Sequence, residues 1–427
     1  MNKALSRNEA SRAGRVQIVR SPGGVLAWLV EDYAVPLVAL DFSFRGGAAQ
    51  DPAGKPGVAT MLAGLLDEGA GPYDANAFHE ALDEEAVHLG FGADRDHIAG
   101  HFQTLTRNAD RAFELLRLAL NEAHLEQGAI DRVRAQLTAG LKREAKDPDS
   151  VAGRLFRETA YAGHPYGAPT RGAIESLPSI TREDLVAARV AQFARDGLVV
   201  AAVGAIDARE LATRLDAVFG ALPAKGMLKD VAPATMQGVG RRIVSEIDVP
   251  QSTIRFGRPA LEKDDPDYMA SVVVMHILGG GAFTARLFRE VREKRGLAYS
   301  AYAGLQNYDR AAMLAGSTST KNERAAESLA VIEEQIRDLS AHGPTQEELD
   351  KAKKFLIGSY DLRFDTSTKI AANLAHLQRE GRAPSYLDER NRMIANVTME
   401  DAKRAAQRVL GDGALLVTVA GRPADMA

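Results

Sequence analysis

Hydrophobic and polar side chains alternate along several short segments of the chain. In residues 37–44 every second side chain is large and apolar, whereas Asp41 and Ser43 belong to the opposite set. A period of two predicts a β-strand with one buried face. Residues 16–30 predict two more strands, joined as a hairpin by the turn residues Ser21, Pro22, Gly23 and Gly24.

Other segments have the period of a helix. Residues 57–69 are apolar around the helical wheel, which predicts a largely buried helix. Residues 75–90 predict a second helix that ends at a glycine, and residues 108–161 predict three more. Because helices are interleaved with hairpin strands, the fold class is α+β, with a largely antiparallel sheet covered by helices. A helix N-cap followed by an acidic third position occurs at Thr181, Thr345 and Thr398.

The most informative regularity is an internal repeat. Val35-Pro36 and Val249-Pro250 each open an alternating segment, and they lie 214 residues apart. Thr181 and Thr398 each begin a helix that precedes an apolar strand, and they lie 217 residues apart. Two landmarks at nearly the same spacing predict two related domains. We place an N-terminal domain at 1–221, a linker rich in Pro, Gly, Ala and Lys at 222–238 and a C-terminal domain at 239–427.

Composition narrows the functional classes. The chain has 427 residues, a net charge of −4 and a pI near 6.2, and it shows no run of basic residues. A nucleic-acid binder would need a basic surface, and a membrane-surface protein would need a basic amphipathic helix, so neither class fits. The absence of cysteine excludes disulfides, thiolate nucleophiles and cysteine-bound zinc.

The cellular location follows only in part. No segment approaches the roughly 20 apolar residues of a membrane-spanning helix. Residues 1–15 lack the apolar core of a signal peptide. We therefore expect a periplasmic location if an export leader has been removed, and a cytoplasmic location otherwise.

A search for catalytic motifs is negative. The zinc motif H-E-x-x-H fails after His79-Glu80, because Asp83 stands where the second histidine would be. His97 and His101 fall on a predicted strand and have no glutamate between them, so they are interpreted as ordinary strand residues. The serine-hydrolase turn Gly-x-Ser-x-Gly and the phosphate-binding loop are also absent, although three glycines follow one another at Gly279, Gly280 and Gly281.

Four segments together resemble one family. Residues 57–71 follow a glycine pair and an Asp-Pro turn, residues 163–167 read GHPYG, residues 180–185 read ITREDL, and residues 278–304 read LGGGAFTARLFREVREKRGLAYSAYAG. In these segments the chain is similar to the pitrilysin/insulinase-type metallopeptidases, which have an inverted zinc motif, and to their mitochondrial-processing-peptidase-like bacterial branch. The resemblance covers nearly the whole chain. It implies two related α+β domains that form half of a clam-shell.

The chain differs from active members of the family at the positions of the zinc motif. Active members of the family have His, Glu and His where this chain has Thr60, Ala63 and Gly64. The family's third ligand is a glutamate further along the chain, but the matching stretch 134–141 contains no carboxylate. Zinc chemistry of this kind needs three protein ligands and a water. The resemblance therefore implies a chain with no metal and no catalytic residues of its own, in which the helix at 57–69 serves packing alone.

The second half keeps a different feature of the family. Arg292 and Tyr299, in the segment REKRGLAY, resemble an Arg/Tyr pair that family members present toward the substrate. There the two side chains donate hydrogen bonds to the peptide backbone or to the developing oxyanion, and such donors stabilise a transition state by roughly 3 kcal/mol each. The resemblance also implies that the loop 279–281 lines the chamber. Without it, Arg292 would be a helix surface residue, Tyr299 a strand aromatic and the glycines a turn.

The resemblance thus implies a non-catalytic subunit of a heterodimeric zinc metallopeptidase. Such a subunit completes the chamber and binds peptide opposite a homologous catalytic subunit, which carries H-x-x-E-H and the zinc. It is not an enzyme on its own and needs no cofactor. Three alternatives stay open: a scaffold subunit like the core proteins of respiratory complexes, a homodimer that binds peptides without cutting them, and a zinc-independent enzyme, for which the sequence offers no set of catalytic residues.

Overall fold

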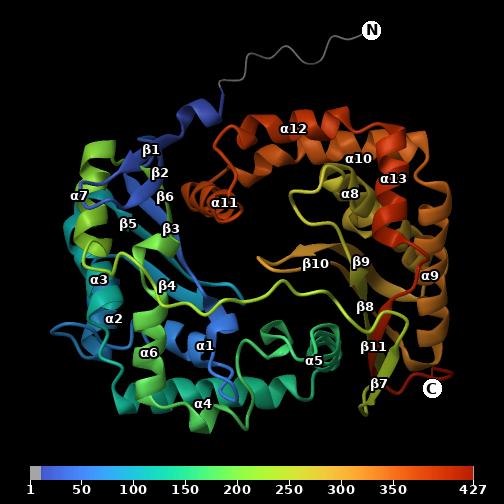
Figure 1. Cartoon of the computed structure of the whole chain (residues 1–427), viewed down its shortest axis with the longest axis horizontal. Helices are drawn as coiled ribbons and strands as arrows, with labels where there is room; N and C mark the ends of the chain where they lie inside the picture. The colour runs from blue at the N-terminus through green and yellow to red at the C-terminus, as the bar shows by residue number, and fades with distance from the viewer. Residues whose placement is uncertain (1–10, 427) are drawn as a thin grey trace. The chain divides into compact units, whose positions relative to one another are not determined.

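The structure is a computed structural model that describes residues 11–426 (Figure 1). Its first sheet is built from the first half of the sequence. The strands are β1 (Gln17–Arg20), β2 (Leu26–Glu31), β3 (Leu37–Arg45), β4 (His88–Ala93), β5 (His97–Leu105) and β6 (Leu198–Gly204). They lie in the order β1-β2-β6-β3-β5-β4. Neighbouring strands are antiparallel except β2 and β6, which are parallel.

The second sheet repeats this arrangement. Its strands are β7 (Arg242–Glu246), β8 (Gln251–Pro259), β9 (Ala298–Asn307), β10 (Ala312–Lys321) and β11 (Leu416–Gly421). They lie in the order β7-β11-β8-β10-β9, and only β7 and β11 are parallel. Strand for strand, this is the order β2-β6-β3-β5-β4 of the first sheet. The predicted internal repeat and the α+β fold class are therefore confirmed.

Thirteen α-helices connect the strands within residues 11–426 (Figure 1). The first half contains α1 (Val58–Ala63), α2 (Ala75–Glu84), α3 (Ala109–Asn121), α4 (Gln127–Glu144), α5 (Pro148–Ala160), α6 (Arg182–Gln192) and α7 (Ala208–Phe219). The second half contains α8 (Tyr268–Met275), α9 (Ala325–His342), α10 (Gln346–Gly358), α11 (Ser367–Arg379), α12 (Tyr386–Asn396) and α13 (Met399–Leu410). The three helices predicted in 108–161 are α3, α4 and α5.

The observed starts of the helices agree with the sequence-based predictions better than the observed ends do. Thr181, Thr345 and Thr398 each form a complete capping box at the start of α6, α10 and α13. The helix predicted at 57–69 ends at Ala63, because Gly64 closes it and the following apolar residues are buried in turns. The helix predicted at 75–90 ends at Glu84. There Ala86 adopts a left-handed conformation, with φ of 48°, that a right-handed helix cannot include.

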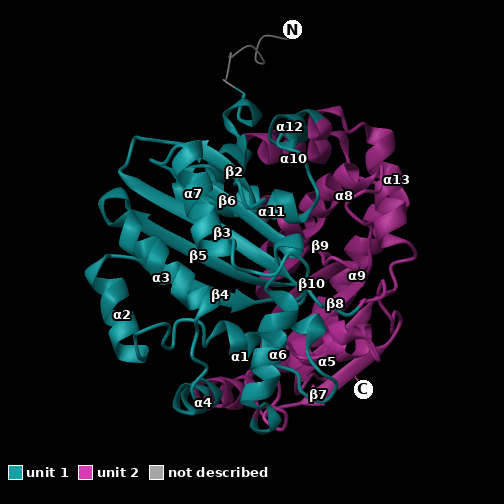
Figure 2. Ribbon diagram, turned by 60° about the vertical axis from the view of Figure 1, so that its left-hand side comes forward, with its two compact units in different colours: residues 1–134, 178–229, 360–392 teal, residues 135–177, 230–359, 393–427 magenta. Residues whose placement is uncertain are grey.

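The described residues form two compact units that do not coincide with the two halves of the sequence (Figure 2). Unit 1 comprises residues 1–134, 178–229 and 360–392, and unit 2 comprises residues 135–177, 230–359 and 393–427. Helix α11, from the second half, packs on β3 and β6, whereas α5, from the first half, packs on β8 and β11. Because β8 and β11 are the repeat equivalents of β3 and β6, the two halves exchange a helix reciprocally.

This exchange buries the second face of each sheet. In unit 1, Trp28 of β2 and Val203 of β6 pack against Leu374 of α11, all at 5% exposure or less. Strand β3 is consequently buried on both faces, and Ser43 is fully covered. The prediction of a single buried face for residues 37–44 is therefore wrong, because the covering helix comes from a distant part of the sequence.

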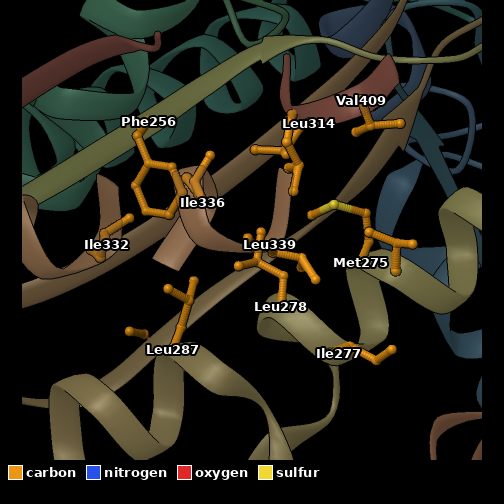
Figure 3. Packing of buried hydrophobic residues seen from close by; sticks show 14 of the residues in the cluster. Phe256, Met275, Ile277, Leu278, Leu287, Leu314, Ile332, Ile336, Leu339 and Val409 are labelled. Carbon is orange, nitrogen blue, oxygen red and sulfur yellow. The ribbon is translucent and has the colours of Figure 1, made fainter. Parts of the chain in front are cut away.

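Unit 2 has a continuous apolar core on the other face of its sheet. Side chains of β8 and β10 pack against α8, α9 and α13 (Figure 3). The labelled members of this core include Phe256, Met275, Leu278, Leu287, Leu314, Ile332, Ile336, Leu339 and Val409. Residues 276–291, which bear the second candidate site, are anchored in this core through Leu278, Leu287 and Val291.

The predicted linker, residues 222–238, contains neither helix nor strand. Its second part is fastened to unit 2: Gln237 N donates to Ala160 O at 2.8 Å, and Nε2 of His164 lies 3.0 Å from Ala232 O. The boundaries 1–221 and 239–427 stay a prediction. Residues 1–10, on which the signal-peptide argument rests, lie outside the described residues. Over residues 11–426, no helix is long and apolar enough to cross a bilayer.

Candidate functional site

The positions that match the family's zinc motif lie on α1 and at its end. Thr60 and Ala63 belong to the helix, and Gly64 follows it. The carboxylate of Asp51 caps the helix by accepting hydrogen bonds from the N–H groups of Gly57 at 2.7 Å and Ala59 at 2.9 Å. Burial raises the pKa of Asp51 to about 6, although these two bonds act in the opposite direction. The helix buries its aliphatic side chains Val58, Ala59, Met61, Leu62 and Ala63.

These positions do not fit a zinc ion. A hydroxyl group and a hydrogen atom replace the two imidazole ligands of the motif, and a methyl group replaces the carboxylate of its general base. A Cβ at Gly64 would lie 3.5 Å from Cγ1 of Val133 on α4, so the last position faces an aliphatic side chain. No cluster of three His, Asp or Glu side chains in the described part of the chain could hold a metal ion. Helix α1 is a packing element.

The second candidate site follows β8 in unit 2. Helix α8 continues into a π-helix, His276–Gly280, and the three glycines lie at its end. At Gly279 a Cβ would lie 2.2 Å from the backbone nitrogen of Ala303 in β9, and at Gly281 it would lie 3.0 Å from the carbonyl oxygen of His276. Gly279 and Gly281 are buried, and Gly280 is exposed. Close packing therefore requires glycine at 279 and leaves little room for a side chain at 281, and of the three glycines only Gly280 is exposed.

The structure brings Arg292 and Tyr299 together. Arg292 lies on a second π-helix, Phe288–Glu293, and Tyr299 lies near the start of β9. Cζ of Arg292 is 4.3 Å from the ring centroid of Tyr299 and 4.9 Å from that of Phe288. Tyr299 is 80% exposed. Among residues 11–426, the side chain of Arg292 takes part in these two ring contacts and in no hydrogen bond or ion pair.

A buried ion pair fixes the segment that carries Arg292. The side chain of Arg286, only 7% exposed, donates two hydrogen bonds to Glu348, at 2.8 and 2.7 Å, and one to Asp338 at 2.6 Å. Glu348 also accepts a hydrogen bond from Thr345 N in the capping box of α10. One carboxylate thus joins the segment to the start of α10, and the Asp338 bond joins it to α9.

A second ion pair closes the turn after Arg292. Glu290, which is buried, accepts hydrogen bonds from Lys294 and Arg295, each at 2.7 Å. Burial by itself would raise the pKa of Glu290, but the two cations outweigh it and lower the pKa. Glu290 is therefore ionised and holds residues 290–295 in one geometry. Two consecutive π-helical segments are uncommon, and such segments are frequent at functional sites.

Two aromatic residues of this site were not predicted from the sequence. Phe283, 71% exposed, contacts Phe288 edge to face, with ring centroids 5.1 Å apart and an interplanar angle of 86°. Phe288 precedes Arg292 by four residues. Because this spacing brings side chains together on a helix, the contact between Phe288 and Arg292 was recognisable in principle from the sequence. No pattern in the sequence indicates that Phe283 is exposed.

Two family models match the chain. Residues 29–174 match the insulinase model of peptidase family M16, and residues 179–356 match the model described as the peptidase M16 inactive domain. The chain belongs to the M16 peptidase family. A solved structure described as a peptidase M16 inactive domain from Pseudomonas fluorescens is 27% identical to this M16 chain, with a TM-score of 0.90, and the match covers 96% of this chain and 98% of that one.

Two relatives indicate the type of M16 member. The chain is 29% identical over 338 residues to the non-peptidase homolog YmxG of Helicobacter pylori, covering 79% of this chain and 78% of that protein. It is 26% identical over 408 residues to the probable mitochondrial-processing peptidase subunit beta of Schizosaccharomyces pombe, and this match covers 91% of this chain and 86% of that protein. With Thr60, Ala63 and Gly64 at the motif positions, the chain is an inactive M16 member, a homologue without a peptidase site of its own.

Proposed function

We propose that this chain is the zinc-less subunit of a heterodimeric zinc metallopeptidase, in which it binds the peptide substrate opposite a homologous catalytic subunit. The observation that carries the proposal is the Arg292–Tyr299 pair. Tyr299 is exposed and Arg292 is half-buried, the side chain of Arg292 has no acceptor among the described residues, and ion pairs on both sides of Arg292 hold its segment in place. Preorganised donors of this kind can hold a peptide carbonyl or the charge that develops on it.

The missing metal site and the retained pair fit a division of labour. Zinc and the general base come from the partner's H-x-x-E-H motif, and this chain has no cofactor. It contributes the opposing wall, with Arg292, Tyr299 and the loop 279–281, in which Gly280 is exposed. The similarity to a chain named as a processing-peptidase subunit supports this role. The proposed location is the periplasm if an export leader has been removed, and the cytoplasm otherwise.

The first experiment is native purification from the source organism, with mass spectrometry of whatever stays bound. We expect a chain of similar size that carries H-x-x-E-H. The two chains are then expressed separately and mixed, and cleavage of a fluorogenic peptide library is measured for each chain alone and for the mixture. Activity in the mixture alone supports the proposal. Recovery of the chain by itself, or only as a homodimer, refutes it and favours the homodimeric peptide binder.

Variants separate a contribution to catalysis from scaffolding. Arg292→Ala and Tyr299→Phe each remove a donor, and we expect each to lower kcat/KM of the complex by roughly a hundredfold. Arg289→Ala is the matched control, because Arg289 lies one turn away and pairs with Glu348 at 3.3 Å. If both site variants assemble with the partner and retain full activity, the chain is a scaffold subunit and the donor role is wrong.

A further inference from the structure

The basic residues around Arg292 differ from it in one respect. Four cationic side chains between residues 286 and 295 have a carboxylate partner: Arg286, Arg289, Lys294 and Arg295 pair with Glu348, Asp338 or Glu290. Arg292 is the exception within this segment, and its side chain has no hydrogen-bond acceptor among residues 11–426. Its guanidinium lies over two aromatic rings in place of an acid. An unpaired arginine among paired neighbours requires its own explanation.

The ring contacts leave one part of Arg292 available. Cζ of Arg292 lies 4.9 Å from the ring centroid of Phe288 and 4.3 Å from that of Tyr299, and an arginine that stacks on an aromatic ring contacts it with the face of its planar group. The N–H donors lie in the plane, along the edge of the group. Two parallel N–H groups on that edge match the two oxygens of a carboxylate. The rings also restrict the side chain before a ligand arrives, so less rotamer entropy is lost on binding.

We propose that Arg292 is a carboxylate receptor, and that the bound peptide presents an Asp or Glu side chain or its own C-terminal carboxylate to it. This inference rests on the proposed function, since it requires that peptide reaches this surface. A neutral carbonyl would accept one hydrogen bond from Arg292, whereas a carboxylate accepts two charge-assisted ones. The receptor therefore prefers an acidic group over an amide at the same position.

Phe283 gives the receptor an apolar neighbour. It is 71% exposed and rests edge-on against Phe288, the ring that lies against Arg292. Tyr299, on the other ring contact of Arg292, is 80% exposed. A carboxylate bound at Arg292 therefore lies beside exposed aromatic surface, which a large apolar side chain of the same peptide can cover. The preferred ligand class is a peptide with a carboxylate next to such a residue.

The test measures fluorescence anisotropy of short labelled peptides with the full chain, alone and in complex with its catalytic partner. Three of four peptides share a central Phe, and the fourth is their control without it. One has Glu beside the Phe and a C-terminal amide, one replaces this Glu with Gln, one has the Gln and a free C-terminal carboxylate placed beside the Phe, and one has Ala in place of the Phe. We expect the Glu peptide, the free-carboxylate peptide or both to bind at least about tenfold more tightly than the neutral peptide. Hydrogen bonds to charged groups are stronger than neutral ones by roughly the free energy that corresponds to a tenfold change in affinity.

Variants assign this preference to Arg292. Arg292→Gln should abolish the preference, and Arg292→Lys should reduce it, because lysine keeps the charge but loses the two-pronged edge. Arg289→Gln should retain it, and so should Tyr299→Phe, which keeps the ring. Phe283→Ala should weaken binding of the peptides with Phe and leave the carboxylate preference unchanged. Circular dichroism checks that each variant is folded.

The outcomes separate this inference from the proposed function. If the neutral peptide binds as tightly as both acidic ones, or if Arg292→Gln keeps the preference, the carboxylate receptor is wrong while peptide binding stands. If no peptide of the set binds, to the chain or to the complex, while the complex still cleaves the fluorogenic library, the receptor is again wrong. If the complex neither binds nor cleaves, both proposals fail.

Discussion

The substitution Gly279→Ala should disable the site through one methyl group. The added Cβ would lie 2.2 Å from the nitrogen of Ala303, 2.9 Å from its Cα and 2.9 Å from its Cβ. Contacts below 3.0 Å are essentially never found for a Cβ, and two of these neighbours are backbone atoms that no side-chain rotation can move. The π-helix and β9 must therefore separate by roughly 1 Å, at an overpacking cost of about 1–3 kcal/mol.

That separation should reduce activity more than stability. Tyr299 lies on β9 four residues before Ala303, so a shift of the strand displaces it from Arg292. A misplacement of about 1 Å at a reacting centre can lower the rate by roughly a hundredfold. We expect Gly279→Ala to remain folded in urea titrations followed by circular dichroism, to bind the proposed catalytic partner, and to lose most of the peptidase activity proposed for the complex.

The neighbouring glycine provides the control. At Gly280 a Cβ would meet its nearest atom, Met275 O, at 3.4 Å, and the residue is exposed. Gly280→Ala should thus be neutral or slightly stabilising, because alanine is the better helix former by about 1 kcal/mol. A Gly279→Ala protein with the stability and activity of the wild type would refute the reasoning. So would a Gly280→Ala protein that is as unstable as the Gly279→Ala protein.

Three further predictions, made with four substitutions, test the supports of the fold. In a urea titration, Arg286→Leu should lower the free energy of unfolding by roughly 3–5 kcal/mol, because it leaves Glu348 buried without its main partner. Arg289→Leu is the control: it removes a partly exposed ion pair with the same Glu348 and should cost less than about 1 kcal/mol. In the folded protein the pKa of Asp51 is raised to about 6. The free energy of unfolding should therefore fall by up to about 3 kcal/mol as the pH rises from about 4 through 6, and Asp51→Asn should remove this fall. Parallel curves of unfolding free energy against pH for the two proteins would contradict this prediction. Leu374→Ala should lower the free energy of unfolding by roughly 2–5 kcal/mol. The unfolding transition is followed by the fluorescence of Trp28, the one tryptophan of the chain. An unchanged transition would show that α11 does not cover the sheet of unit 1.

The sequence was informative where local chemistry determines structure. The capping boxes at Thr181, Thr345 and Thr398 depend on residues three positions apart, so the pattern contains all that is needed. The repeat was visible because the same strand order required similar signals at a similar spacing in both halves. The absence of two zinc ligands and of the general base at Thr60, Gly64 and Ala63 follows from residue identity alone.

The rest depended on contacts between distant residues. Alternation in residues 37–44 predicted one buried face, but nothing near that segment reveals that Leu374 and its neighbours cover the other. The ion pair of Arg286 with Glu348 spans 62 positions, and neither residue differs locally from an ordinary surface charge. The same is true of Phe283, whose exposure depends on the π-helices on either side of it.

The repeat explains how the chain could lose the zinc motif without losing the fold. Helix α1 follows β3, and α8 with its π-helix follows the equivalent strand β8. Both segments bury aliphatic side chains, Met61 and Leu62 in one and Val274 and Leu278 in the other, and among the described residues neither belongs to a cluster of side chains that could hold a metal ion. Because packing and not metal binding stabilises this position in both domains, the residues at 60, 63 and 64 were free to change. The Arg292–Tyr299 pair lies outside that packing, so the proposed role of the pair in peptide binding is separable from the stability of this segment.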